Sequence, residues 1–304
     1  MSLAPVAVFA YNRPDHFRRV AEALAQNPGA SASRLFVFSD APGNASAAEG
    51  VAKVRSHAHS LKGFDSVEVI EQPSNQGVAR SIINGVTDLT AKFGKVIVLE
   101  DDLLPSPHFL NYMNDALDFY EDNEHVISVH AYSYPVSETL PKTFFLRGAD
   151  CWGWATWKRG WDLFEANGEK SLRELRSRKL SHDFDFGGNY PFTQMLRDCI
   201  DGENDSWAIR WYASAFLLGK FTLYPASSQV QNIGADGSGM HVGATRSFEH
   251  QKWGESTVIE DIPVEDSRVS RRAFAAYLSG LRPSRVKRVL KRIANAFETK
   301  SSKP

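Results

Sequence analysis

Three consecutive carboxylates, Glu100, Asp101 and Asp102, directly follow the apolar stretch 96–99, and we call them the acidic triad. At the rim of a buried strand, mutual repulsion and partial desolvation disfavour their charged forms. A bound cation removes this cost. Carboxylate oxygens suit Mg²⁺ or Mn²⁺, which also bridges the oxygens of a diphosphate. The motif therefore predicts a cation site, and the alternative is a solvated loop whose acids favour the start of the next helix.

A second stretch that could do chemistry is the glycine-rich segment 232–241. Its glycines allow the backbone to approach a phosphate closely, and Asp236 and His241 are candidate ligands for a phosphate or a metal. An ordinary surface loop has the same composition, so both interpretations stay open.

Four tryptophans gather between residues 152 and 161. An indole ring combines a large apolar area with a polar edge and can hold a sugar ring. Trp157 and Trp161 stand at helical spacing, so we expect them to fill the core. Trp152 and Trp154, on either side of Gly153, are the better candidates for contact with a sugar.

The elements that must position these residues are short strands that alternate with amphipathic helices. This pattern predicts an α/β fold with a mixed, mostly parallel sheet flanked by helices. Ligands of such sheets bind beyond the carboxyl ends of the strands. In the first third, strands are expected at 6–10, 35–38, 67–70 and 95–99, each followed by a polar turn.

In the acidic triad and the following helix, the chain resembles glycosyltransferases of the GT-A (Rossmann-like) fold, most closely the N-acetylglucosaminyltransferase I type. The other residues that carry the resemblance are Leu103, Ser106, Pro107, Phe109 and Tyr112. In that family the motif is an EDD version of the DXD signature. Its last acid binds Mn²⁺ and its first two lie near the ribose and the donor sugar. The resemblance implies that Asp102 is the metal ligand and that Glu100 and Asp101 contact the donor.

The resemblance extends to three earlier turns. It implies that Arg13 lies near the nucleotide phosphate and that Asp40 binds the uracil edge. Arg80, at the start of the helix after Asn75-Gln76-Gly77, would contact a phosphate or the ribose. Each residue also has an ordinary role at a turn or helix start, but their shared position at the carboxyl edge of the sheet favours one site.

In the same family a mobile loop in the region 234–241 closes over the donor and excludes water. By this resemblance His241 is expected to contact the phosphate or the metal.

Sugar transfer with inversion, which the family implies, needs a general base for the acceptor hydroxyl. In related enzymes the base is an acid beside a tryptophan, and the segment 207–211 looks like that site. This chain has Ala208 where an acid is expected. Asp205 is the nearest replacement, with Glu203 and Asp201 behind it, and a surface acid is the alternative.

The sequence thus predicts an enzyme. We expect a glycosyltransferase, dependent on Mn²⁺ or Mg²⁺, that moves a sugar from a nucleotide-diphosphate sugar to a glycan hydroxyl in cell-surface polysaccharide synthesis. By resemblance the donor is a UDP-sugar. One alternative is a sugar-nucleotide nucleotidyltransferase, which normally needs a glycine-rich loop that is not seen after the first strand. The other is an inactive glycan-binding or nucleotide-binding relative, which Ala208 leaves open.

Three regions are expected along the chain. Residues 1–130 form the nucleotide-sugar-binding half, 131–265 the acceptor-binding and catalytic half, and 266–304 a basic amphipathic tail. In this tail, residues 284–297 have the profile of a helix on an anionic membrane surface, which would suit a lipid-linked acceptor. A helix docked on its own domain is the alternative.

Composition limits the classes of partner and compartment. The net charge of −1 gives no reason to expect a nucleic-acid partner, and two cysteines indicate neither a disulfide framework nor a zinc cluster. No stretch reaches the ~18 apolar residues that span a bilayer, and the N-terminus lacks the pattern of a signal peptide. We expect a cytoplasmic protein, with peripheral contact at the inner face of the membrane through its tail.

Overall fold

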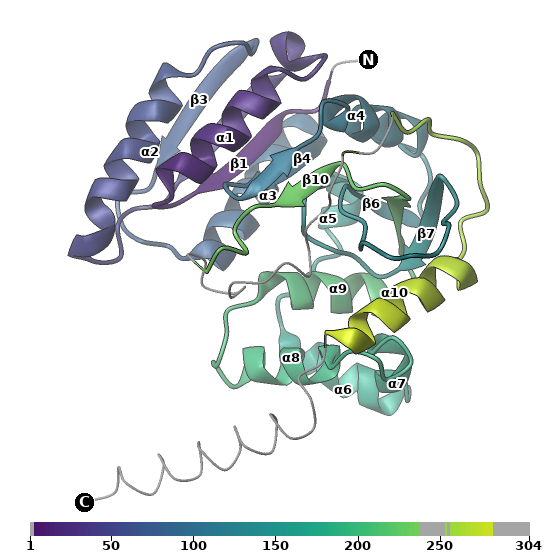
Figure 1. The fold of residues 1–304 in the computed structure, drawn as a ribbon. Coiled ribbons are helices and arrows are strands. Elements are labelled where there is room, and N and C mark those ends of the chain that lie inside the picture. The colour runs from purple at the N-terminus through teal and green to yellow at the C-terminus, as the bar shows by residue number, and fades with distance from the viewer. Residues whose placement is uncertain (1–2, 238–252, 254–255, 282–304) are drawn as a thin grey trace, which may run out of the picture.

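The computed structural model describes residues 3–237, 253 and 256–281. At its centre lies an eight-stranded sheet with the order β3-β2-β1-β4-β8-β6-β9-β7 (Figure 1). The strands are β1 (Val6–Ala10), β2 (Arg34–Ser39), β3 (Ser66–Glu71), β4 (Lys95–Glu100), β6 (Val126–His130), β7 (Thr143–Arg147), β8 (Trp154–Trp157) and β9 (Phe221–Pro225). A separate antiparallel pair joins β5 (Leu103–Pro105) to β10 (Val230–Asn232).

The sheet is mixed and mostly parallel. Strands β1, β2, β3 and β4 run side by side in one direction, and β6 and β9 share that direction. Strand β8 lies antiparallel between β4 and β6, and β7 is antiparallel to β9. The predicted fold class, a mixed and mostly parallel sheet flanked by helices, is confirmed.

Helices cover both faces of the sheet, because its strands carry buried side chains on both sides. One layer of the core packs α1, α2 and α4 on the sheet, and the other packs α3, α5 and α9. The helices are α1 (Pro14–Ala25), α2 (Ala48–Ser60), α3 (Val78–Phe93), α4 (Phe109–Phe119), α5 (Lys158–Trp161), α6 (Gly168–Ser177), α7 (Ser181–Phe184), α8 (Phe192–Ile200), α9 (Trp207–Leu217) and α10 (Arg268–Gly280).

Helix α1 shows how the sequence specifies one of these layers. Pro14 occupies its first turn, where the missing amide hydrogen costs no hydrogen bond. Phe17, Val20 and Leu24 follow at helical spacing, and all three side chains are buried against the sheet. The expected strand–turn–helix unit is therefore present, and it sets the direction of the loop that leaves β1.

The chain order reverses at β1, which has β2 on one side and β4 on the other. In doubly wound sheets a crevice opens beyond the carboxyl ends of the strands at such a reversal, because the two flanking loops leave in opposite directions. The loops after β1 and β4 lie at this reversal, where such a crevice is expected, and we call the place the crevice between β1 and β4. These loops carry Arg13 and the acidic triad.

The second half of the chain adds a helical layer, α6 to α9, at one end of the molecule (Figure 1). Helix α10, the first part of the expected tail, docks on this layer through Phe274 and Leu278, which are buried. The predicted amphipathic helix at 284–297 lies outside the described residues. Among the residues that are described, no helix is long and apolar enough to cross a membrane.

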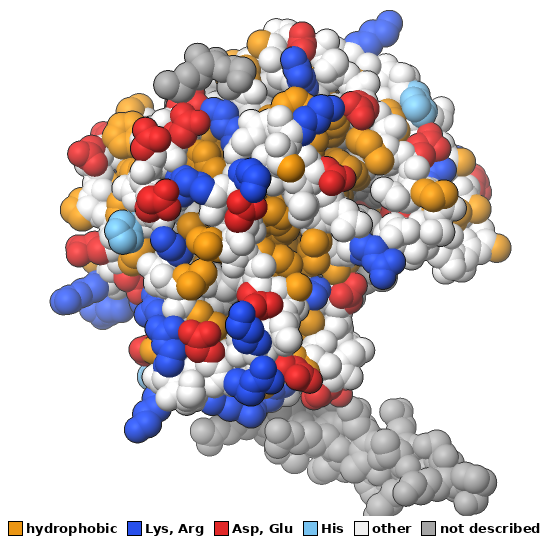
Figure 2. Space-filling view, turned by 180° about the vertical axis from the view of Figure 1, so that it is seen from behind, with side chains coloured by type: hydrophobic (Ala, Val, Ile, Leu, Met, Phe, Trp, Pro, Cys, Tyr) orange, Lys and Arg blue, Asp and Glu red, His pale blue; other side chains and the backbone are white. Residues whose placement is uncertain are grey.

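The charged side chains of the surface are mixed in sign. On the face seen in Figure 2, Lys and Arg side chains alternate with Asp and Glu over most of the area. The near-zero net charge of the chain therefore does not come from two large opposed patches on this face.

Candidate active site

Asp101 ties the end of β4 to the loop after β1. Its amide donates to the carbonyl of Phe9 at 3.0 Å, and its Oδ2 accepts the Tyr11 N–H at 3.2 Å. The residue is only 3 % exposed. A carboxylate so placed fixes the edges of the crevice between β1 and β4.

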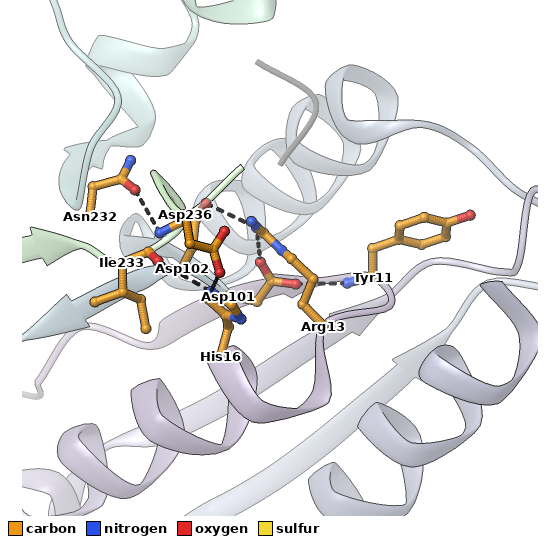
Figure 3. A network of polar contacts seen from close by, with 9 residues as sticks. Tyr11, Arg13, His16, Asp101, Asp102, Asn232, Ile233 and Asp236 are labelled. Atoms are coloured by element: carbon orange, nitrogen blue, oxygen red, sulfur yellow. Dashed lines mark hydrogen bonds and ion pairs between the residues drawn. The ribbon is translucent and has the colours of Figure 1, made fainter. Parts of the chain in front are cut away.

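Arg13 joins two members of the acidic triad. Its Nη2 pairs with Oδ1 of Asp101 and, at 2.9 Å, with Oδ2 of Asp102. Burial alone would lower the pKa of Arg13, but the charges of Asp101 and Asp102 outweigh it and raise that pKa. The predicted neighbours Arg13, Asp101 and Asp102 thus converge (Figure 3).

The acidic triad carries more negative charge than Arg13 neutralises. Burial, followed by the charges of Asp102 and Asp101, raises the pKa of Glu100 to about 8. Burial is also the main cause that raises the pKa of Asp101 to about 6, although Arg13 opposes it. Neutral or cation-bound forms are therefore favoured at this rim of the sheet.

The segment after β10 folds back over Asp102. The Ile233 N–H donates to the Asp102 carbonyl at 2.8 Å, and the Asn232 side chain accepts the Gly234 N–H at 2.9 Å. From α1, His16 Nε2 lies 3.2 Å from both the Ile233 carbonyl and Asp236 Oδ2 (Figure 3). The start of the glycine-rich stretch therefore lies beside the acidic triad, and a role for it in ligand binding stays a prediction.

A second set of predicted residues meets one loop further along the edge. Asp40 Oδ1 accepts the N–H groups of Ala41 and Gln76, both at 2.8 Å, and Oδ2 accepts the Gly77 N–H at 2.9 Å and the Asn75 amide at 3.1 Å. Asp40 is buried, so these bonds satisfy both oxygens and hold the loop before α3.

Arg80 and Tyr11 also make hydrogen bonds in this region. Arg80 is exposed on the first turn of α3, where Nη1 donates to Gln76 Oε1 at 3.4 Å. Tyr11 links the loop region to the acidic triad, because its amide bonds Asp101 while its hydroxyl accepts the Gly43 N–H at 2.9 Å.

Asp205 lies beside Gly77, the residue before α3. A Cβ at Gly77 would lie 3.9 Å from Asp205 Oδ2, and Oδ1 is 3.5 Å from Arg210 Nη2. Its side chain is 68 % exposed. His241, the expected donor contact, lies outside the described residues.

One expectation about the tryptophans is wrong. Trp154 was a candidate sugar contact, but it is 1 % exposed and packs among Trp161, Trp207 and Trp211. The aromatic run suits a core layer as well as a binding surface, and the strand β8 turns this side chain inward. Trp152 is half-buried.

The donor set fits a hard divalent cation. Asp102 supplies a carboxylate whose side chain is 19 % exposed, beside the buried Asp101 and the half-buried Glu100. Mg²⁺ and Mn²⁺ accept few protein carboxylates and complete their coordination with water and phosphate oxygens. Among the residues with described positions, no group of three or more His, Cys, Asp or Glu side chains is placed to hold a metal ion by itself. An open, substrate-completed site is the arrangement that this chemistry allows.

The sequence did not single out several residues that build the site. His16 and the amide of Tyr11 hold its walls through contacts that span 217 and 90 positions in sequence, and Asn232 fixes Gly234 locally. The only local signal was the turn 11–14 and the glycine content of 232–241. Contacts of this length depend on the fold, which the local pattern does not specify.

The comparisons with known proteins address the first half most directly. Residues 1–146, just under half of the chain, match the model of the GNT-I family. No curated protein matches the sequence.

Several solved structures are similar to part of the chain. A mannosyltransferase from Pyrobaculum calidifontis, in complex with GDP-Man and Mn²⁺, is 16 % identical with a TM-score of 0.33, over 44 % of this chain and 36 % of its own. TarS from S. aureus is 14 % identical with a TM-score of 0.31, over 45 % and 23 %. Glucosyl-3-phosphoglycerate synthase from Mycobacterium tuberculosis, with Mn²⁺, UDP and glucosyl-3-phosphoglycerate, is 11 % identical with a TM-score of 0.32, over 53 % and 58 %.

In each pair the likeness spans less than two thirds of the other protein. The match to the family model, by contrast, includes Arg13, Asp40, Arg80 and the acidic triad. The resemblance to the GNT-I type that the sequence predicts is confirmed for residues 1–146.

Proposed function

We propose that the protein is a glycosyltransferase that transfers a sugar from a nucleotide-diphosphate sugar to a hydroxyl group, with a divalent cation. The observation that carries the proposal is the position of Arg13 and the acidic triad on the two sides of the crevice between β1 and β4. A crevice at a reversal of strand order is where such sheets bind nucleotides.

The residues of the crevice have complementary tasks in this proposal. Asp102 would hold Mn²⁺ or Mg²⁺, which supplies positive charge beside the diphosphate leaving group. Arg13, already fixed by Asp101, places a second positive charge at the same rim. The segment around Gly234 covers Asp102 and limits the access of water.

The nucleotide would extend from the crevice toward the loop before α3. Asp40 shapes this loop through its four hydrogen bonds, and Arg80 offers an exposed positive charge at the first turn of the helix. The resemblance favours a UDP-sugar, inversion at the anomeric carbon and a glycan acceptor. In this scheme residues 1–130 bind the donor and 131–265 bind the acceptor.

Thermal shift with nucleotide diphosphates tests the proposal first. A ligand that binds only the folded state stabilises it by about 2.7 kcal/mol at a hundred times its dissociation constant. We expect UDP with Mn²⁺ to raise the melting temperature and EDTA to abolish the effect. Asp102→Asn should lose the Mn²⁺-dependent part, whereas Asp88→Asn, an exposed position on α3, should keep it.

Donor turnover is the second measurement. The wild-type protein, with Mn²⁺, should release UDP from at least one UDP-sugar, and chelation should stop this release. A protein that binds UDP but releases none from any nucleotide sugar would be a binding protein, and the proposed transfer would be wrong.

A further inference from the structure

A second carboxylate, Asp150, lies at the same edge of the sheet as the acidic triad. Strand β8 runs antiparallel between β4 and β6, and its first residue, Trp154, pairs with Val98 of β4 and with His130 of β6. The turn 150–153 that precedes β8 therefore stands at the carboxyl ends of β4 and β6, next to the acidic triad.

The turn that carries Asp150 is held rigidly. His130 Nε2 accepts the Trp152 N–H at 3.0 Å, and Asp150 Oδ1 accepts the Cys151 N–H at 2.8 Å and lies 3.8 Å from His130 Nε2. Burial lowers the pKa of His130, which keeps the Nε2 lone pair available for the Trp152 amide. The Asp150 side chain nevertheless remains 30 % exposed. A carboxylate thus reaches solvent from a fixed backbone.

Packing against β10 places this turn beside the donor crevice. A Cβ at Gly153 would lie 2.8 Å from Val230, the first residue of β10, and β10 leads to Ile233, which bonds the backbone of Asp102. In addition, burial and then the charges of Asp150, Glu100 and Asp102 raise the pKa of the Cys151 thiol. The charge of Asp150 and the charges of the acidic triad therefore both raise the pKa of Cys151.

An aromatic surface adjoins Asp150. Trp152 is half-buried, and its ring meets Tyr132 edge-on, with the centroids 4.8 Å apart. An indole braced in this way gives a rigid, partly apolar face, and sugars use such faces while a nearby carboxylate binds a hydroxyl. The chemical class that fits this combination is a pyranoside with a free hydroxyl.

We propose that Asp150 is the general base that accepts the proton of the acceptor hydroxyl, while Trp152 packs against the acceptor sugar. The inference rests on the glycosyl transfer proposed above. In the step, the acceptor oxygen forms a bond to the anomeric carbon, and its proton moves to a carboxylate oxygen of Asp150. The bond from the anomeric carbon to the diphosphate oxygen breaks, and its electron pair leaves with the nucleoside diphosphate. The proton on Asp150 then passes to water.

Asp205 fits this role less well. It is the more exposed of the two acids, and it lies within reach of a positive charge on Arg210 and beside the nucleotide-side residue Gly77. Among the described residues, no lysine or arginine forms an ion pair with Asp150. A general base must be free to approach the acceptor hydroxyl, and the ion pair of Asp205 with Arg210 restricts that approach.

The matched pair Asp150→Asn and Asp205→Asn tests the assignment. With Mn²⁺ and the UDP-sugar from which wild type releases UDP, we expect Asp150→Asn to lower UDP release to water and to a panel of methyl glycosides by roughly 10²- to 10⁴-fold. Its UDP affinity, measured by titration, should stay within about threefold of wild type. Asp205→Asn, at the rival candidate, should lose far less of the rate than Asp150→Asn, and Asp88→Asn, at an exposed position on α3, should keep the wild-type rate.

Four outcomes would overturn the assignment. Wild-type rates in Asp150→Asn would exclude it as the base, and an equal loss of UDP affinity in that variant would show a structural role. If Asp150→Asn does not fold, Asp150→Glu, which keeps the acid, must retain measurable turnover while Asp150→Ser does not. If wild type itself releases no UDP from any donor, the proposed function fails and the base assignment fails with it.

Discussion

Gly234 lies directly against the carboxylate of Asp102. A Cβ at position 234 would overlap Asp102 Oδ2 and would stand 2.9 Å from Arg13 Nη1. The Ile233 amide and the Asn232 side chain hold the backbone in this position. This contact joins two parts of the chain that lie more than a hundred residues apart. Because glycine has no Cβ, the backbone at position 234 can lie against Asp102, and any larger residue there would fill the space above the acidic triad.

Substitution of Gly234 by alanine should therefore disturb the site. We expect Gly234→Ala to lower the free energy of unfolding by about 1–3 kcal/mol, as overpacking does, and to weaken Mn²⁺-dependent UDP binding by tenfold or more, which is about 1.4 kcal/mol. Thermal shift with and without UDP and Mn²⁺ measures both effects. Gly280→Ala is the control, because a Cβ there meets nothing within 4 Å. Equal behaviour of the two variants would contradict the close contact.

Removal of the Arg13 charge should leave two acids of the acidic triad without their ion pair. In Arg13→Gln the buried Asp101 loses its cationic partner, and breaking a buried pair on one side destabilises by about 3–5 kcal/mol. Urea denaturation measures the loss. Arg18→Gln, on the helix α1 that follows Arg13, removes an exposed pair with Glu22 and should change stability by less than about 1 kcal/mol.

Mn²⁺ should offset part of the Arg13→Gln defect, because a cation supplies some of the missing positive charge. The control Arg18→Gln should show no such recovery beyond that of wild type. If Arg13→Gln were as stable as wild type without metal, the acids would not depend on this arginine, and the electrostatic account of the crevice would be wrong.

The first half of the fold was predictable because its signals are local. Strands buried on both faces appear as apolar runs, and residues such as Pro14 and Gly77 mark where helices begin. Since parallel strands end at one edge, the polar turns after β1, β2 and β4 had to lie together. The proximity of Arg13 to Asp101 and Asp102 followed from this rule.

The second half depends on pairings that no local pattern specifies. Strand β8 enters the sheet between β4 and β6, although two other strands come between β4 and β8 in the main sheet's chain order. This insertion turns Trp154 inward and brings Asp150 to the carboxyl edge. Asp150 does not belong to a recognisable sequence motif. Ala208 stands where an acid was expected, so the prediction turned to the nearby Asp205. A position in space, not a spacing in sequence, distinguishes the two acids.

The buried imidazole of His130 should make stability depend on pH. Burial, opposed only in part by Asp150, lowers its pKa in the folded protein below the unfolded value near 6.5. The unfolded chain then binds a proton first as pH falls. The stabilising contribution is complete above about pH 6.5 and is lost as pH falls toward the folded pKa, by up to about 1.4 kcal/mol per pH unit.

The comparison with His130→Gln isolates this effect, because Gln can accept the Trp152 N–H but does not titrate in this range. Denaturation between pH 8 and pH 5 should show that the stability difference, wild type minus variant, shrinks as pH falls. The exposed His125→Gln should give a constant difference. A constant difference for His130→Gln as well would show that the ring is not held neutral by burial.

The last prediction concerns Asp40, whose two oxygens accept four hydrogen bonds from the loop before α3. In Asp40→Asn an amide group would face N–H donors, which should destabilise the protein by roughly 1–3 kcal/mol and weaken UDP binding by loosening the loop. Denaturation and UDP titration measure these losses. Asp65→Asn, an exposed acid 3.6 Å from Arg34, should leave both unchanged. Full stability with lost UDP affinity in Asp40→Asn would instead mean that Asp40 contacts the nucleotide directly.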